Sequence, residues 1–267
     1  MDLLWLLPLV FVLALISGVY YKLNSVSLSL ILIPGMLGFE SLLPVSVEDS
    51  LLILIASCLA ASLPFCVLSF VSAAKNFKGD FELVSRFFAT RVSLSSILIA
   101  QILGIVPSIY VYSFYCILLA LFAMSLILGP YLNREKYFQE SFSGRFWYLS
   151  LLSLPLGAAG TEWRKVLPIK SNTEGFDYFS TLSMFVVFPA LLGFVFPALP
   201  VTVFESQQWQ QNWMIGYICW PLSILVFCGS YIGNALVKNT QNQTDKAWLH
   251  YILALFLLAI VIRSIIT

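Results

Sequence analysis

Three charged side chains interrupt an apolar stretch in the second half of the chain. The segment 157–165 reads Gly-Ala-Ala-Gly-Thr-Glu-Trp-Arg-Lys, and apolar residues precede and follow it. Ionisable groups are costly at membrane depth, so they persist there mainly where they pair or line a polar cavity. Gly157 and Gly160 let the backbone turn and approach a small ligand closely. The pattern predicts a functional site in this segment.

The charges at this segment favour an anion as the ligand. Arg164 and Lys165 supply positive charge, and a helix that begins at Arg164 would add free amides at its N-terminus. Glu162 could pair with one of the cations or carry a coupling proton. The alternative is a shallow turn whose long side chains reach back to the membrane interface. Glu40 is a second candidate, since it lies in an apolar block; the alternative is a residue at an external mouth.

The composition places this segment in a membrane protein. The chain has 267 residues, of which 60% are hydrophobic and 10% charged, and its mean hydropathy is +0.93. Soluble domains carry about 25% charged residues. A net charge of +1 argues against a nucleic-acid partner. Apolar blocks that could cross as helices lie at about 3–21, 26–45, 50–74, 92–108, 112–130, 146–169, 178–200, 214–237 and 248–266. The sequence predicts an all-α polytopic membrane protein.

Basic residues predict the orientation of these blocks. Lys and Arg gather in the connections 75–91, 131–145 and 238–247, and are absent from 46–49, 107–111 and 201–213. The positive-inside rule places the first set in the cytoplasm and the second outside. This pattern is self-consistent only if the block 146–169 enters and leaves on the cytoplasmic side as a re-entrant hairpin. Blocks 3–21 and 26–45 could be two spans or one deep hairpin.

The two halves then share one plan of a broken hairpin followed by three crossings. The first hairpin opens outward and the second inward, so the halves are inverted. Leu119-Ala-Leu-Phe122 in the last helix of the first half recurs as Leu253-Ala-Leu-Phe256 in the second. We expect a first repeat over 1–131, a cytoplasmic linker over 132–144 and a second repeat over 145–267. Inverted repeats with broken helices are typical of secondary transporters.

The layout resembles the sulfite exporter TauE/SafE family of membrane anion permeases. The resemblance rests on the loop Lys78-Gly79-Asp80-Phe81-Glu82-Leu83, on the Gly-bearing helix 229–238 and on prolines at the exits of the two hairpins. It implies two inverted membrane repeats and transport of sulfite, another sulfur oxyanion or an organosulfonate. The predicted substrate-binding residues are Gly157, Gly160, Thr161, Glu162, Arg164, Lys165, Pro168, Pro34 and Glu40.

We therefore expect a secondary transporter of a small anion that works by alternating access in the bacterial inner membrane. A coupling proton or sodium ion and a homodimeric assembly are compatible with the pattern. No metal, cofactor or enzymatic activity is expected. Two other classes stay open: a membrane subunit that scaffolds another protein, and an enzyme that acts on lipid. The scaffold predicts that replacing Arg164 and Lys165 leaves function intact, and the enzyme requires polar residues that converge at one leaflet.

Overall fold

The fold is a bundle of helices with one small β-hairpin. The computed structural model describes residues 6–24, 28–38, 47–76, 93–128, 178–196, 214–237 and 247–266. The helices are α1 (Leu6–Asn24), α2 (Ser29–Gly38), α3 (Val47–Asn76), the helix Ser93–Ile105, α5 (Ser108–Leu128), α7 (Tyr178–Val195), α8 (Trp220–Leu236) and α9 (Ala247–Ile266). The strands are β1 (Met214–Ile215) and β2 (Ile218–Cys219). The predicted helical class is confirmed for this part of the chain.

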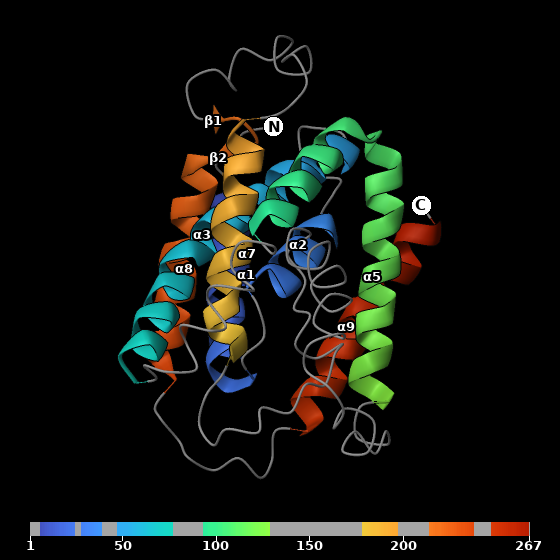
Figure 1. The fold of residues 1–267 in the computed structure, drawn as a ribbon. Coiled ribbons are helices and arrows are strands. Elements are labelled where there is room, and N and C mark those ends of the chain that lie inside the picture. The colour runs from blue at the N-terminus through green and yellow to red at the C-terminus, as the bar shows by residue number, and fades with distance from the viewer. Residues whose placement is uncertain are drawn as a thin grey trace, which may run out of the picture.

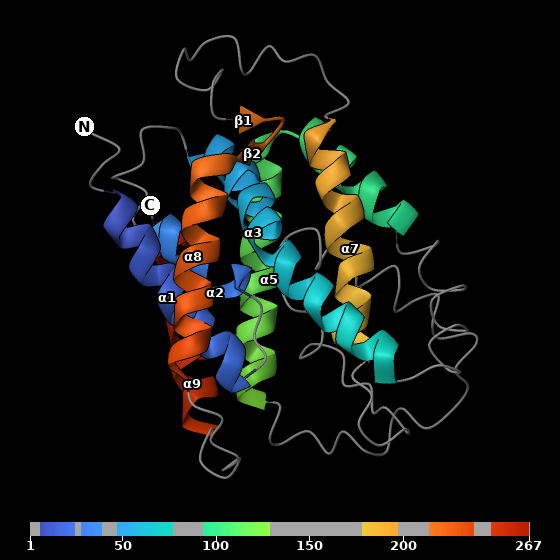
Figure 2. The ribbon, with the colours of Figure 1, turned by 90° about the vertical axis from the view of Figure 1, so that its left-hand side faces the viewer.

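The helices run alternately between two ends of the bundle. Colour and labels in Figures 1 and 2 show α1, α3, α5 and α8 running away from the end that carries the β-hairpin. The helix Ser93–Ile105, α7 and α9 run back toward that end. We call it the hairpin end and the other the far end. Helix α3 packs along α7, α5 along α9, and α1 along α8.

Helix α2 lies in the middle of the bundle at mid-height (Figures 1 and 2). It has ten residues, and those from Ser29 to Leu37 are all buried. Ten residues of α-helix span about 15 Å, half the thickness of a bilayer core. The Ser17 hydroxyl of α1 donates to the Leu28 carbonyl at 2.9 Å and ties the start of α2 to its neighbour. Of the two readings left open for 26–45, the short α2 favours a hairpin with α1.

Helices α1 and α8 run in the same direction and approach each other closely where small residues lie between them. In α8, Gly229 and Gly233 are one turn apart and lie against Ala14 and Leu15 of α1. The Ser230 hydroxyl donates to the Ala14 carbonyl at 3.2 Å. Packing of this kind, with small residues four apart and a hydroxyl bonded across, is common between helices in membranes.

The helix Ser93–Ile105 and α7 form a second parallel pair. The Ser96 hydroxyl donates to the Val186 carbonyl at 2.7 Å, and the Gln101 amide donates to the Gly193 carbonyl at 2.8 Å. A Cβ on Gly193 would lie 2.7 Å from that of Ala100. Side-chain donors on one helix thus fix its register against the backbone of the next.

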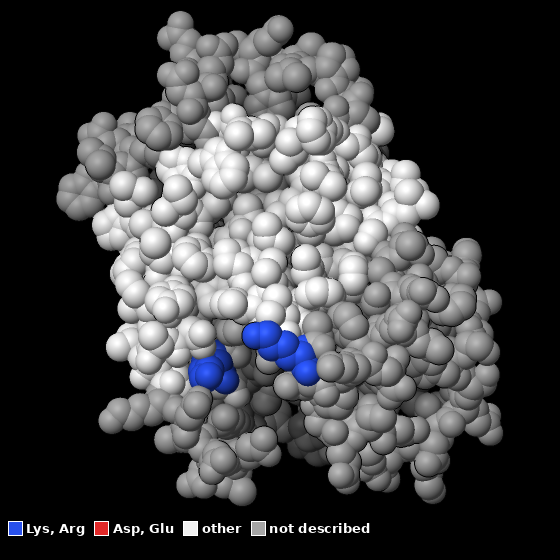
Figure 3. All heavy atoms as spheres, turned by 60° about the vertical axis from the view of Figure 1, so that its left-hand side comes forward, with Lys and Arg blue, Asp and Glu red and all other residues white. Residues whose placement is uncertain are grey.

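The outer faces of the helices are apolar. On α5 Ile109 is exposed, and from Tyr110 onward exposed large side chains recur every three or four residues: Tyr110, Phe114, Ile117, Leu121 and Met124. In Figure 3 the described side chains of one face form a broad uncharged band, with basic groups only near its lower edge.

One described helix is long and apolar enough to cross a membrane by length and composition. It is α3, whose window Leu51–Val71 has a mean hydropathy of 2.6, while the apolar stretches of the other described helices are shorter. A buried core helix meets the same criterion, so α3 alone does not establish a membrane protein. The described helices α1, α5, α7 and α9 have 19, 21, 18 and 20 residues, close to the length that a spanning helix needs.

The block 214–237 was predicted as one helix, and that prediction is wrong at its start. Residues 214–219 form the β-hairpin, and α8 begins only at Trp220. The cause is local, because Gly216 has a φ of 58° and Pro221 occupies the first turn of α8. Proline fits the first turn, where its missing N–H costs no helical hydrogen bond. Pro64 and Pro189, in contrast, lie inside α3 and α7.

Candidate functional site

Of the predicted site residues, Pro34 is the one that lies in the described part of the chain. It occupies α2 and is fully buried there. The predicted residues Glu40, Gly157, Gly160, Thr161, Glu162, Arg164, Lys165 and Pro168 lie outside the described residues. Those predictions therefore stay predictions, and the site can be built from the surroundings of α2.

Pro34 leaves a gap in the hydrogen bonding of α2. Proline has no N–H, so the Leu30 carbonyl loses the donor that a helix would place at position 34. Leu30 is fully buried, which keeps bulk water away from this carbonyl. A buried carbonyl without a donor is costly, so broken helices with such groups tend to mark functional positions.

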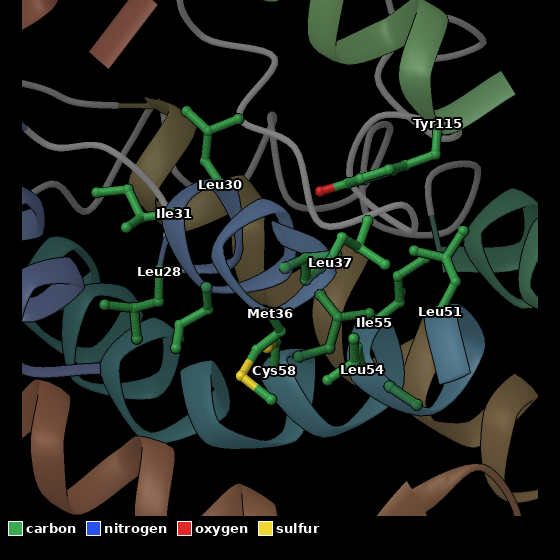
Figure 4. Packing of buried hydrophobic residues seen from close by; sticks show 14 of the residues in the cluster. Leu28, Leu30, Ile31, Met36, Leu37, Leu51, Leu54, Ile55, Cys58 and Tyr115 are labelled. Atoms are coloured by element: carbon green, nitrogen blue, oxygen red, sulfur yellow. The ribbon is translucent and has the colours of Figure 1, made fainter. Parts of the chain in front are cut away.

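The Tyr115 side chain reaches α2 from α5. Figure 4 shows its hydroxyl pointing toward α2, above Leu37 and on the side away from Cys58. The residue is 1% exposed, and its hydroxyl has no hydrogen-bond partner in the structure. An unsatisfied hydroxyl in an apolar core costs about 1–3 kcal/mol. Tyr115 therefore presents an unused donor and acceptor to the centre of the bundle.

A basic side chain meets the end of α2. The Arg263 guanidinium of α9 donates to the carbonyl of Gly38, the last residue of α2. The carbonyl end of a helix carries partial negative charge, so a cation is stabilised there.

Small polar groups join α5 to α9 beside Arg263. The Tyr112 hydroxyl bonds the Ser264 hydroxyl, and the Cys116 thiol lies 3.4 Å from the same Ser264 oxygen. Because Ser264 follows Arg263 directly, these bonds fix the part of α9 that presents the guanidinium. We call Tyr115, the buried α2 and Arg263, which is exposed beside the last residue of α2, the central cluster.

The central cluster supplies hydrogen-bond donors and one full positive charge. Such groups suit an oxygen-bearing anion, which accepts hydrogen bonds and gains from a nearby cation. Among the described residues, no group of three His, Cys, Asp or Glu side chains gathers as a metal site would.

Sequence reasoning did not single out Tyr115 or Arg263. Arg263 carries a signal that could have been used, because it is a lone cation between Ile262 and Ser264 in the apolar run that ends the chain. Tyr115 carries no such signal, since it is one of 12 tyrosines in an aromatic-rich chain. Only its burial in the folded bundle distinguishes it from exposed Tyr110.

Comparison with protein-family models, with curated proteins and with solved structures finds no match to this chain.

Proposed function

We propose that this protein is a membrane-embedded secondary transporter of a small anion. The observation that carries the proposal is α2, a ten-residue helix buried on all sides, whose last carbonyl meets Arg263. Broken helices near the middle of a membrane are where secondary transporters bind their substrates. Tyr115 of α5 and Arg263 of α9 would contribute to the anion site. Arg164 and Lys165 would contribute from the second hairpin.

The apolar surface supports a membrane location. The exposed faces of the helices other than α2 carry large apolar side chains, and lipid would cover them. Lys22 and Lys75 end α1 and α3 at the far end. By the positive-inside rule we assign the far end to the cytoplasm and the hairpin end to the outside. We propose the inner membrane of a bacterium as the location.

Helix directions support an inverted duplication. The predicted repeats pair α3 with α7, the helix Ser93–Ile105 with α8, and α5 with α9. In each pair the two helices run in opposite directions (Figures 1 and 2). Opposite directions are what inverted repeats require, and α3 with α7 and α5 with α9 also pack together. This plan is also the one that the resemblance to the TauE/SafE family implies, and it is our ground for proposing sulfite or an organosulfonate as substrate.

The test is anion flux into proteoliposomes that contain the purified protein. We expect labelled sulfite to exchange across the membrane. Arg263→Gln should raise the sulfite concentration that gives half-maximal flux about ten- to hundredfold, since a charge-assisted bond contributes about 1.5–3 kcal/mol. Lys22→Gln is the matched control, because Lys22 is an exposed cation at the far end of α1. Flux that is equal in wild type and in Arg263→Gln would reject the role of the central cluster. Wild-type protein that exchanges neither sulfite nor a sulfonate would favour a scaffold.

A further inference from the structure

The β-hairpin lies over the end of the bundle that we assign to the outside. Its strands pair Met214 with Cys219 and Ile215 with Ile218, and the turn between them is Gly216-Tyr217. Gly216 adopts a left-handed conformation, and a Cβ there would lie 2.2 Å from the Phe194 carbonyl oxygen. Only glycine lets the turn press this closely on the end of α7.

Tyr217 fills the space between α7 and the helix Ser93–Ile105. Its N–H donates to the Phe194 carbonyl at 3.1 Å, and the two rings meet edge to face with centroids 6.2 Å apart. A Cβ on Gly104 would lie 3.5 Å from both Cε2 and the hydroxyl oxygen of Tyr217. The tyrosine ring therefore touches helices from both halves of the chain.

The second strand anchors the hairpin to α3. The Cys219 N–H donates to the Ser57 hydroxyl oxygen at 3.0 Å. Ser57 is fully buried, and the next residue of α3, Cys58, is 2% exposed. Figure 4 shows Cys58 beside Met36 of α2, in the core that Tyr115 also enters. The hairpin is thus tied to the part of α3 that packs against α2.

Among the described residues, the hairpin is held by two hydrogen bonds, one aromatic contact and one buried side chain. The Cys219 N–H bonds the Ser57 hydroxyl, the Tyr217 N–H bonds the Phe194 carbonyl, and the rings of Tyr217 and Phe194 meet edge to face. Ile218 is 4% exposed and packs in the core. The two hydrogen bonds to Ser57 and Phe194 are not bonds within a helix, so breaking them leaves α3 and α7 intact. Alternating access requires this kind of closure, one that joins both repeats at one end and releases.

We propose that the hairpin 214–219 is the outer gate of the transport path, with Tyr217 as the side chain that seals it. This inference rests on the proposed transport function. When Tyr217 is in place, the core around Cys58 is closed to the outside. When the hairpin lifts, Cys58 and the central cluster become accessible from that end.

Cys58 is a native reporter for this gate. In a background where Cys66, Cys116, Cys219 and Cys228 are serine, Cys58 is the remaining thiol. A membrane-impermeant methanethiosulfonate reagent is applied from the outside to protein in proteoliposomes. We expect Tyr217→Ala to raise the rate of Cys58 modification about tenfold, which is about 1.4 kcal/mol in the opening equilibrium.

Two controls separate gating from general loosening. Tyr110→Ala removes a tyrosine that is 66% exposed on α5, and it should leave the Cys58 rate unchanged. In a second background, Cys66 is the one cysteine retained, and it lies further along α3 toward the far end. There Tyr217→Ala should leave the rate of Cys66 modification unchanged. An unchanged Cys58 rate in a Tyr217→Ala protein that melts at the background temperature would overturn the proposal.

If Tyr217→Ala does not fold, Ser57→Ala carries the test. It removes the acceptor of the Cys219 N–H without touching the turn, and an unchanged Cys58 rate would again overturn the gate. Because the labelling requires no substrate, its outcome is independent of anion flux. A raised rate together with absent sulfite exchange would retain the hairpin as a gate over the core and reject the proposed substrate. Normal sulfite exchange together with an unchanged Cys58 rate would retain the proposed substrate and reject the hairpin as a gate.

Discussion

Replacing Gly233 by alanine should force α8 away from α1. A Cβ at Gly233 would lie 2.1 Å from the carbonyl oxygen of Leu15 and 3.1 Å from the amide nitrogen of Val19. Both atoms belong to the α1 backbone, so no side chain can rotate to make room. The helices must separate by about 1 Å before the methyl group reaches contact distance.

The cost of this separation can be worked out from the contact. Overpacking a close interface costs about 1–3 kcal/mol, and a clash with backbone belongs at the upper end. Alanine recovers about 1 kcal/mol of helix propensity relative to glycine. The net loss is therefore about 2 kcal/mol, or about 4–8 °C of melting temperature if each kcal/mol shifts it by 2–4 °C. Thermal melting in detergent measures this shift.

Gly35 provides a matched comparison, because its neighbour is a side chain. A Cβ at Gly35 would lie 3.0 Å from Cδ2 of Leu13, which can move. In double-mutant cycles, Leu13→Ala should relieve Gly35→Ala with a clear favourable coupling energy. Leu15→Ala should not relieve Gly233→Ala, because the clashing atom is the carbonyl oxygen. A Gly233→Ala protein that melts like wild type, or one that Leu15→Ala rescues, would refute the backbone-contact argument.

Three further outcomes are expected. Ser57→Ala leaves the Cys219 N–H without its acceptor, so it should destabilise the protein by about 1–3 kcal/mol, read from the shift of the melting temperature. Tyr115→Phe removes a buried hydroxyl that has no partner, so it should keep or raise the melting temperature while weakening anion binding; a marked drop in stability would show that the hydroxyl is bonded. Single cysteines at Ser206 and Asn242 should report opposite sides of the membrane, with Ser206 labelled from outside intact cells; external labelling of Asn242 alone would contradict the proposed orientation.

Sequence periodicity and composition determined the helical class and most helix positions. The blocks predicted at 50–74, 112–130 and 248–266 correspond to α3, α5 and α9 within a few residues. Long apolar runs without alternation can satisfy their backbone only as helices when water is absent, so this part of the fold is encoded locally. A break was predicted at 107–111, and the structure has it at Val106–Pro107, with α5 beginning at Ser108. Pro107 cannot continue the preceding helix, which is why the sequence indicated a break here.

Tertiary structure decided which residues meet around α2. Pro34 could be named from the sequence, but neither Tyr115 nor Arg263 could be assigned to it. The burial of Tyr115 and the bond from Arg263 to Gly38 depend on how the helices pack. The hairpin at 214–219 was missed for a related reason. Its short strands are apolar and read as the start of a helix, while the contacts that hold them come from Ser57 and Phe194, far away in the sequence. Local pattern determines which segments are helical, and only long-range packing determines which of their side chains share a site.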